Sequence, residues 1–434
     1  MALSISEKFK AYSLSFKVIS FVGAGLFFLT LGFSTSSDSS SNLNHSLLQE
    51  EPSEAIKLSD QPNSASLMSS PFIIPEGFGE RVDFWIKIYS QYTSNDAVFH
   101  DSQDLSVIYK VIDLRPIMDS ALHPFVKEFK TKKLIERERK ILIRDLLAIK
   151  TNWSSQSFTP AQQELLKALK YPQKKSFVSE AIKNLRMQIG QKTFIEKAIN
   201  NADLYLPMME QIFLKKGLPV ELTRMPFVES SFNLAARSRV GASGIWQIMP
   251  ATGRKLMPNK FVDYRNDPIK ATEFAASLLK FNYKVLGDWP LAVTAYNHGP
   301  TSISKLTKKY GTKNLSTLTK RVYGSHAFAF ASANFYACFL AILEIEKNRP
   351  KYFPDVPKVE PISLKTIQIK KPLRYTRLLS WFDRDALKAE LYNPHLSGMI
   401  RSGRVEIPRG TIVYIPTNAS QVAVQEQRPS LTEL

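Results

Sequence analysis

Apolar residues recur every three or four positions along most of the chain, which is the spacing of amphipathic helices. In the N-terminal half this spacing predicts helices in RVDFWIKIYSQY, PFVKEFKTKKLIERERKILIRDLLAI and FIEKAINNADLYLPMMEQIFLKKG, whereas AVFH and LSVIYKVIDL predict two short strands. Residues 204–348 have a predominantly helical pattern, with breaks at LPVE, SRVGASG, DWP and NHGP. After Pro350, the segments KTIQIKK, RLLSWF, DALKAELYNP and GTIVYIP predict a strand, two helices and a strand. The pattern therefore predicts a mainly α protein with an N-terminal, mostly helical α+β region and a small C-terminal α+β module.

The N-terminus has the residue order of an export signal. Lys8, Lys10 and Lys17 precede the uncharged stretch 18–33, and serine-rich sequence follows. This stretch is short for a helix that needs about 20 residues to cross a bilayer, yet it lacks a clean A-x-A cleavage site. A cleaved signal peptide and an uncleaved membrane anchor are therefore both open. Either one predicts an exported protein of the periplasm or cell envelope.

Changes in composition divide the chain into seven segments. A stretch rich in Ser, Asn, Pro and acids, without sustained period, predicts a flexible tether before the first periodic segment. The predicted segments are a signal peptide or membrane anchor (1–34), a Ser-rich tether (35–74), a helical scaffold (75–200), a central domain (201–350), a linker (351–361), a small module (362–417) and a polar tail (418–434).

The charge of the chain favours an anionic polymer or surface as its surroundings. There are 58 Lys and Arg against 39 acidic residues, giving a net charge of +19. Because the basic residues are scattered and form no recognisable nucleic-acid module, we expect no nucleic-acid partner. The lone Cys338 excludes a disulfide framework. The six histidines form no H-x-x-x-H or H-E-x-x-H motif, so we expect neither a metal nor another cofactor.

The segment LPVELTRMPFVESSF carries the main candidate for chemistry, Glu229. Pro219 is placed to begin a helix, and Glu229 falls late in it, between Met225 and Phe232. Apolar neighbours raise the pKa of a carboxyl group by desolvation, and the carbonyl end of a helix disfavours an added negative charge. A carboxyl kept protonated near neutral pH can act as a general acid toward a glycosidic oxygen.

Two later segments add polar and aromatic groups. In GASGIWQ the glycines allow a tight turn, while Trp246 and Gln247 suit stacking on sugars and hydrogen bonding to them. TAYNHG places Tyr296, Asn297 and His298 at the end of a helix. Each segment alone is common in purely structural roles, as a buried loop or a helix cap. Together they indicate a neutral saccharide as the ligand, because the glycine-rich loop with Lys of a phosphate site is absent.

The order LPVELTRMPFVESSF, GASGIWQIMPATG, DPIKATEFAASLL and DWPLAVTAYNHGP resembles the lytic transglycosylase (SLT) domain, most closely that of the membrane-bound lytic murein transglycosylase D type. The resemblance covers about residues 200–348, with Glu-Ser, Gly-x-x-Gln and Ala-Tyr-Asn in the family order. It implies a lysozyme-like helical catalytic domain, the glycan strands of peptidoglycan as substrate, and Glu229 as the catalytic acid and base. We expect substrate contacts from Ser230, Ser231, Gly244, Trp246, Gln247, Met249, Tyr296, Asn297 and Tyr336.

A mechanism with one carboxyl group fits this sequence better than one with two. Two-carboxylate glycosidases place their acids about 5 to 9.5 Å apart, but the first acid after Glu229 is Asp263. The family resemblance implies that Glu229 first protonates the leaving oxygen and then takes a proton from the muramoyl C6 hydroxyl, giving a 1,6-anhydro product. The rival interpretations are a goose-type lysozyme-like hydrolase, which would use water, and an inactive wall-binding or assembly protein with the same fold.

The chain departs from the family in two places. Where the family commonly has Glu-Thr-x-x-Tyr, this chain has 331–335 as ASANF, with Tyr336 next. A supporting phenol comes from Tyr336 in one interpretation, and in the other the helical spacing of Phe335, Phe339 and Ile342 marks a core stripe. Residues 362–417 resemble a LysM-type module through LYNP and IPRGTIVYIP but lack its usual opening Gly-Asp-Thr-Leu. A glycan-binding module and a small packing domain are both open there.

Overall fold

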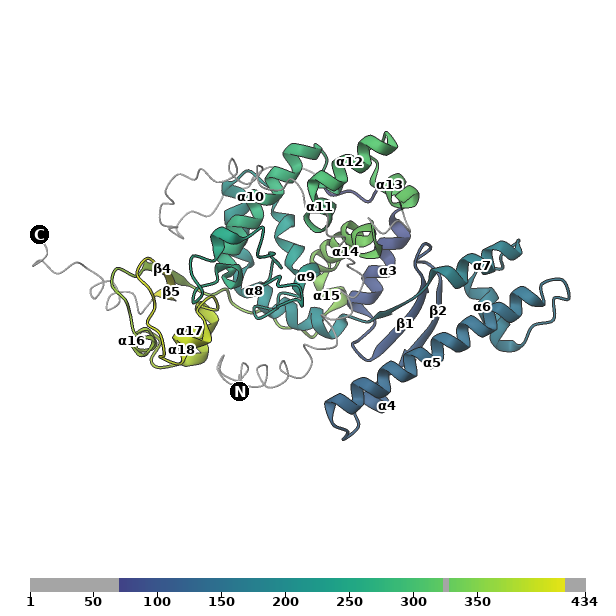
Figure 1. Cartoon of the computed structure of the whole chain (residues 1–434), viewed down its shortest axis with the longest axis horizontal. Helices are drawn as coiled ribbons and strands as arrows, with labels where there is room; N and C mark the ends of the chain where they lie inside the picture. The colour runs from purple at the N-terminus through teal and green to yellow at the C-terminus, as the bar shows by residue number, and fades with distance from the viewer. Residues whose placement is uncertain (1–69, 323–327, 418–434) are drawn as a thin grey trace, which may run out of the picture.

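The computed structural model describes residues 70–322 and 328–417, in which helices dominate (Figure 1). The mainly α class predicted from the sequence is confirmed. The predicted export segment, nearly all of the predicted tether and the polar tail lie outside the described residues. Among the residues that are described, no helix has both the length and the apolar character that crossing a membrane requires.

An arm formed by residues 96–189 contains a three-stranded antiparallel sheet. Strand β1 (Asp96–Asp101) lies between β2 (Ile108–Asp113) and β3 (Leu185–Ile189). The two predicted strands are confirmed as β1 and β2, whereas the sequence analysis did not predict β3. Four helices connect β2 to β3, namely α4 (Arg115–Met118), α5 (Pro124–Thr151), α6 (Pro160–Ala168) and α7 (Lys175–Asn184). The buried face of α5 and the sheet share a small apolar core of their own.

The helical body is built around α14 (Phe330–Lys347), which is buried along most of its length. Helix α3 (Gly79–Ser90) packs against α14, and the chain then leaves to form the arm and returns through α8 (Lys192–Lys215). The boundary expected between residues 200 and 201 therefore falls inside α8. The other elements of the body are η1 (Val220–Arg224), α9 (Met225–Ser230), η2 (Arg254–Leu256), η3 (Tyr264–Asn266), α10 (Pro268–Leu286), α11 (Trp289–His298), α12 (Pro300–Tyr310), α13 (Leu315–Val322) and α15 (Arg349–Tyr352).

Local sequence explains where α10 begins and ends. The carboxylate of Asp267 accepts hydrogen bonds from the backbone N–H groups of Ile269 and Lys270, and Pro268 occupies the first turn. At the other end, Gly287 adopts a left-handed conformation with φ +68°, which closes the last turn. Helix α10 is thus fixed at both ends. It packs behind the loop that contains Gly244 and Trp246.

The C-terminal module consists of two paired strands and three short helices. Strands β4 (Leu364–Gln368) and β5 (Ile412–Pro416) are antiparallel and enclose α16 (Tyr375–Ser380), α17 (Ala386–Tyr392) and α18 (Gly398–Arg401). The predicted order of strand, helix, helix and strand is present, with α18 in addition. That this module is of the LysM type and binds glycan stays a prediction.

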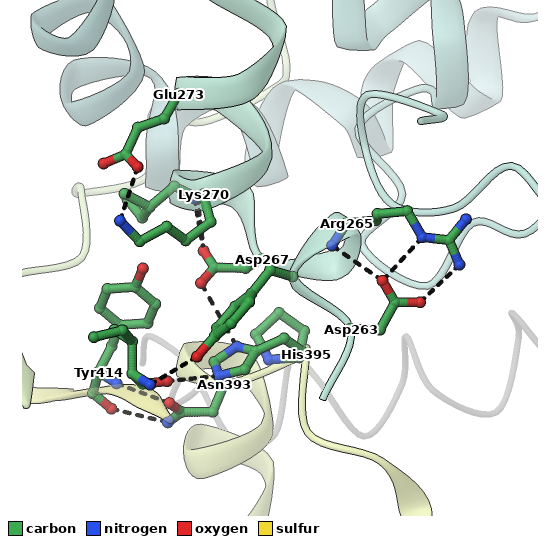
Figure 2. Close-up of polar contacts among 12 residues, drawn as sticks. Asp263, Arg265, Asp267, Lys270, Glu273, Asn393, His395 and Tyr414 are labelled. Carbon is green, nitrogen blue, oxygen red and sulfur yellow. Dashed lines mark hydrogen bonds and ion pairs between the residues drawn. The ribbon is translucent and has the colours of Figure 1, made fainter. Parts of the chain in front are cut away.

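Buried polar groups join the module to the body (Figure 2). His395, just after α17, lies 3.7 Å from the carboxylate of Asp267, and neither side chain is exposed. Desolvation lowers the pKa of His395 to about 4 and raises the pKa of Asp267 to about 6. The backbone N–H of Ile412 in β5 donates to the hydroxyl of Tyr264 at 2.8 Å. The residue that caps α10 is therefore also the residue against which the module packs.

Candidate active site

Glu229 lies in the last turn of a short helix. The sequence predicted one helix from Pro219, but the structure divides the segment into the 3-10 turn η1 and the single α-helix α9. Helix α9 ends because Ser231 adopts a left-handed conformation, with φ +49°. The carboxyl group of Glu229 is therefore placed beside the carbonyl end of α9, as the sequence predicted, on a helix shorter than expected.

The carboxyl group of Glu229 is partly buried and strongly desolvated. This desolvation raises its pKa from 4.5 to about 8, as the apolar neighbours in the sequence predicted. Within the described ranges no hydrogen bond to this carboxyl group is present. Burial, followed by the nearby charge of Glu229, raises the pKa of Tyr296 well above 10. At neutral pH Glu229 is thus a protonated acid that has no partner among residues 70–322 and 328–417.

Tyr89 of α3 also faces this acid, and the sequence analysis did not find it. Burial is the largest cause of its raised pKa, followed by contact with Cys338 and then by the charge of Glu229. The thiol of Cys338 on α14 lies close to this phenol, and burial raises the pKa of both groups. Because Tyr89 comes from a helix that precedes the whole arm, no local motif could have linked it to Glu229.

The loop containing Gly244 is held in a conformation that only glycine allows. Gly244 has φ +75°, and a Cβ atom at this position would lie 1.8 Å from the backbone oxygen of Arg265. Arg265 pairs with Asp263 at 2.8 Å and donates to the carbonyl oxygens of Gly241 and Ile248 at 2.8 and 3.2 Å (Figure 2 shows the ion pair). The predicted tight turn is present, and a buried arginine fixes it from behind.

Trp246 does not have the role that the sequence suggested. Its side chain has no exposed surface, stacks on Phe213 and donates from Nε1 to the hydroxyl of Thr272 at 2.8 Å. In this position the indole cannot stack on a sugar. The prediction was wrong because long-range packing against α8 and α10, which local sequence does not reveal, draws the ring inward.

The polar side chains around this loop mostly bind the backbone. Ser230 donates to the carbonyl oxygen of Ile245 at 2.9 Å, which ties α9 to the loop. Gln247 has φ +45°, and its amide nitrogen donates to the carbonyl oxygen of Gly244 at 2.8 Å. Ser231 and Met249 are partly exposed. These contacts shape the wall next to Glu229, while the carbonyl oxygen of the Gln247 side chain remains without a partner in the described part of the chain.

Tyr296 and Asn297, at the end of α11, close the same region. The phenol of Tyr296 donates to the backbone oxygen of Trp246 at 2.9 Å. The side-chain oxygen of Asn297 accepts from the hydroxyl of Ser332 at 2.8 Å, and this hydroxyl lies 3.2 Å from Nδ1 of His298. Orienting Asn297 through its oxygen leaves its amide nitrogen available as a donor to a ligand.

Tyr336 lies in the core of the body. Its side chain is buried, its ring lies beside Phe78 and Phe339, and its hydroxyl donates to the backbone oxygen of Ile73 at 3.1 Å. The substrate contact expected of Tyr336 is therefore wrong, and the core-stripe interpretation of this part of α14 is correct. Within the described residues, no three His, Cys, Asp or Glu side chains are grouped so that they could hold a metal ion.

Comparison with known proteins finds similarity in the central part of the chain. Residues 213–319 match the model of the transglycosylase SLT domain family. Over 211 residues the chain is 28% identical to the membrane-bound lytic murein transglycosylase D of Escherichia coli K12, covering 48% of this chain and 46% of that protein. A putative tributyltin chloride resistance protein of Alteromonas is 37% identical over 114 residues, covering 26% of this chain and 54% of that protein. The chain thus spans about half the length of the curated relatives it matches.

A solved structure also aligns with the chain. The soluble lytic transglycosylase SLT70 of Escherichia coli shares 17% identity over 53% of this chain and 45% of its own, with a TM-score of 0.28. The family match from residue 213 to residue 319 includes Glu229, Gly244 and Tyr296, whereas Tyr89 and Tyr336 lie outside it.

Proposed function

We propose that this protein is a lytic transglycosylase that cleaves peptidoglycan between MurNAc and GlcNAc without water, and the match of residues 213–319 to the transglycosylase SLT domain family supports this. The products would carry 1,6-anhydroMurNAc ends. One observation carries the proposal: Glu229 has a pKa of about 8 and no hydrogen-bond partner in the described chain, and so is a protonated acid ready to donate.

In the proposed reaction Glu229 acts twice. Its proton passes to the glycosidic oxygen as the bond from the muramoyl C1 breaks, which leaves an oxocarbenium-like sugar and a carboxylate. The C6 hydroxyl of the same sugar then attacks C1 and gives its proton to Glu229, which restores the starting acid. A pKa of about 8 keeps the carboxyl group protonated for the first step, and it makes the carboxylate that forms a stronger base for the second step.

The surrounding groups support the charged stage of this reaction. Tyr296 is held by the carbonyl oxygen of Trp246, so that its ring forms a fixed wall near Glu229. The amide nitrogen of Asn297 has no partner in the part of the chain that the structure describes, so it can donate to a substrate oxygen. Asp263, the next acid along the chain, is ion-paired with Arg265 at 2.8 Å and is committed to the loop. A second catalytic carboxylate is not supplied from that position.

We also propose that the protein acts in the cell envelope. The substrate lies there, and the basic, then apolar, then serine-rich order of the first residues supports export.

Product chemistry tests the proposed function. The purified full chain is incubated with peptidoglycan, and the soluble products are identified by mass spectrometry. Anhydro-muramoyl ends from the wild type and none from Glu229→Gln are expected. Glu221→Gln, a partly exposed acid on the preceding turn, is the matched control and should cleave normally. Reducing ends would show a hydrolase instead, and binding without any product would show a wall-binding protein.

A further inference from the structure

The exposed face of α5 carries apolar and basic side chains that have no role in the proposed cleavage. Phe125 and Phe129 are 73% and 52% exposed, one helical turn apart on the same face. Large apolar side chains exposed together on a charged helix are uncommon on the surface of a soluble protein and mark contact sites. In Figure 1 this end of α5 lies beside α4 at one end of the arm, outside the helical body.

Basic side chains continue the row formed by Phe125 and Phe129 along α5, and we call this row the α5 stripe. Helix α5 carries nine Lys and Arg but four acidic residues. Lys133 follows Phe129 by one turn, with Nζ 4.5 Å from the centre of the ring, and Arg137 follows by another. No acidic side chain within the described ranges pairs with Lys130 or Lys133. The stripe therefore runs from apolar at the tip to cationic along its length.

A shallow groove beside this stripe has the same composition. It is lined by apolar side chains from α4 and α5 and by four basic side chains with one acid, namely Ile117, Lys130, Lys133, Leu134, Glu136, Arg137 and Lys140. A groove of this kind can receive an anionic group from its open side while an apolar chain lies along its floor.

We infer that this face of α5 docks on an anionic phospholipid membrane, with Phe125 and Phe129 entering the interface and the lysines contacting headgroup phosphates. Aromatic side chains beside clustered lysines are the composition of surface-bound amphipathic helices. An anionic polymer alone would need only the charges and would leave the two phenyl rings in water. A second copy of this chain is opposed by repulsion between the two basic faces.

Docking of this kind would orient the enzyme. In Figure 1 the arm and the C-terminal module lie at opposite ends of the molecule. Contact through α5 would therefore place the arm, and not the C-terminal module, against the membrane. This inference is independent of any attachment through the N-terminal segment, because it concerns which face lies against the lipid.

The test uses the full chain with a cysteine at Ala121, an exposed residue just before α5. Cys338 is buried, so an environment-sensitive fluorophore will label the new thiol. With vesicles of phosphatidylcholine and phosphatidylglycerol, we expect a blue shift and a several-fold rise in emission that nitroxide lipids quench. Vesicles of phosphatidylcholine alone should give much less, and added salt should reduce the signal.

Two variants and one control complete the experiment. In the same labelled background, Phe125→Ser with Phe129→Ser, and separately Lys130→Glu with Lys133→Glu, should each remove most of the signal. A label at Met399, exposed on the C-terminal module, should remain unchanged. None of these residues is near Glu229, so peptidoglycan cleavage should persist in every variant. A failure of the docking inference can therefore be distinguished from a failure of the proposed activity.

Three results would overturn the inference. The first is emission at position 121 that does not respond to anionic vesicles, or that responds equally to phosphatidylcholine alone. The second is an equal response to soluble peptidoglycan fragments or DNA without lipid, which would assign the face to an anionic polymer. The third is a change that needs no vesicles and grows with protein concentration, which would assign it to a second copy of the chain.

Discussion

Replacing Glu229 by glutamine is expected to stabilise the folded protein at alkaline pH. The pKa of Glu229 is about 8 in the folded state, against an ordinary value of 4.5. Between these values the folded protein keeps a proton that the unfolded chain releases. The stability associated with the raised pKa is therefore fully present below pH 4.5 and is lost as the pH rises through 8. Glutamine has a similar shape and does not titrate, so the variant escapes this loss.

The magnitude follows from the size of the shift. One pKa unit corresponds to about 1.4 kcal/mol, so the free energy of unfolding of Glu229→Gln should gain roughly 3 kcal/mol on the wild type between pH 5 and pH 8. Urea unfolding followed by tryptophan fluorescence at both pH values measures it. Glu221→Gln is the control and should show no such gain. An equal difference between Glu229→Gln and wild type at pH 5 and pH 8 would refute a desolvated, protonated Glu229.

Four further results are expected. Cleavage by the wild type should fall about tenfold per pH unit above pH 8, as Glu229 loses its proton, in a peptidoglycan release assay. Gly244→Ala should lose cleavage and at least about 2 kcal/mol in urea unfolding, because its Cβ would meet a backbone oxygen at 1.8 Å. Trp246→Phe should keep cleavage but lose about 1 kcal/mol with the indole hydrogen bond. The pKa of His395 is lowered to about 4, so the contribution of His395 to stability should fall as the pH drops from 6.5 to 4, and His395→Gln should gain stability relative to the wild type between these pH values in urea unfolding.

The features that could be predicted from the sequence depend on residues close together in the chain. The desolvation of Glu229 follows from Phe227 and Phe232, which lie in the same segment. The tight turn at Gly244 follows from the local glycine pattern. In both cases the physical cause lies within one turn or one loop, so a motif contains it.

The failures share the opposite property. Strand β3 depends on pairing with β1, far away in the sequence, and the alternation of apolar and polar residues in LRMQI, only five residues long and directly after α7, was too short a signal to predict it. Trp246 packs against Phe213 of α8, and Tyr336 packs against Phe78, the residue just before α3. Whether an aromatic ring faces a ligand or the core is decided by these distant partners. The local sequence shows that an aromatic residue is present, but it does not show which distant residues the ring contacts.

The buried position of Trp246 changes the role that we assign to this residue. The phenol of Tyr296 holds the backbone oxygen of Trp246, and the indole of Trp246 holds Thr272 on α10. One residue therefore connects α11, the loop and α10, which together form the wall next to Glu229. Trp246→Ala should then lower stability and cleavage together, whereas loss of a sugar-stacking ring would weaken substrate binding at unchanged stability. A lower urea midpoint would show the loss of a positioning residue, whereas a higher KM at an unchanged urea midpoint would show the loss of a substrate contact. These two measurements can therefore assign Trp246 as a positioning residue without any bound ligand.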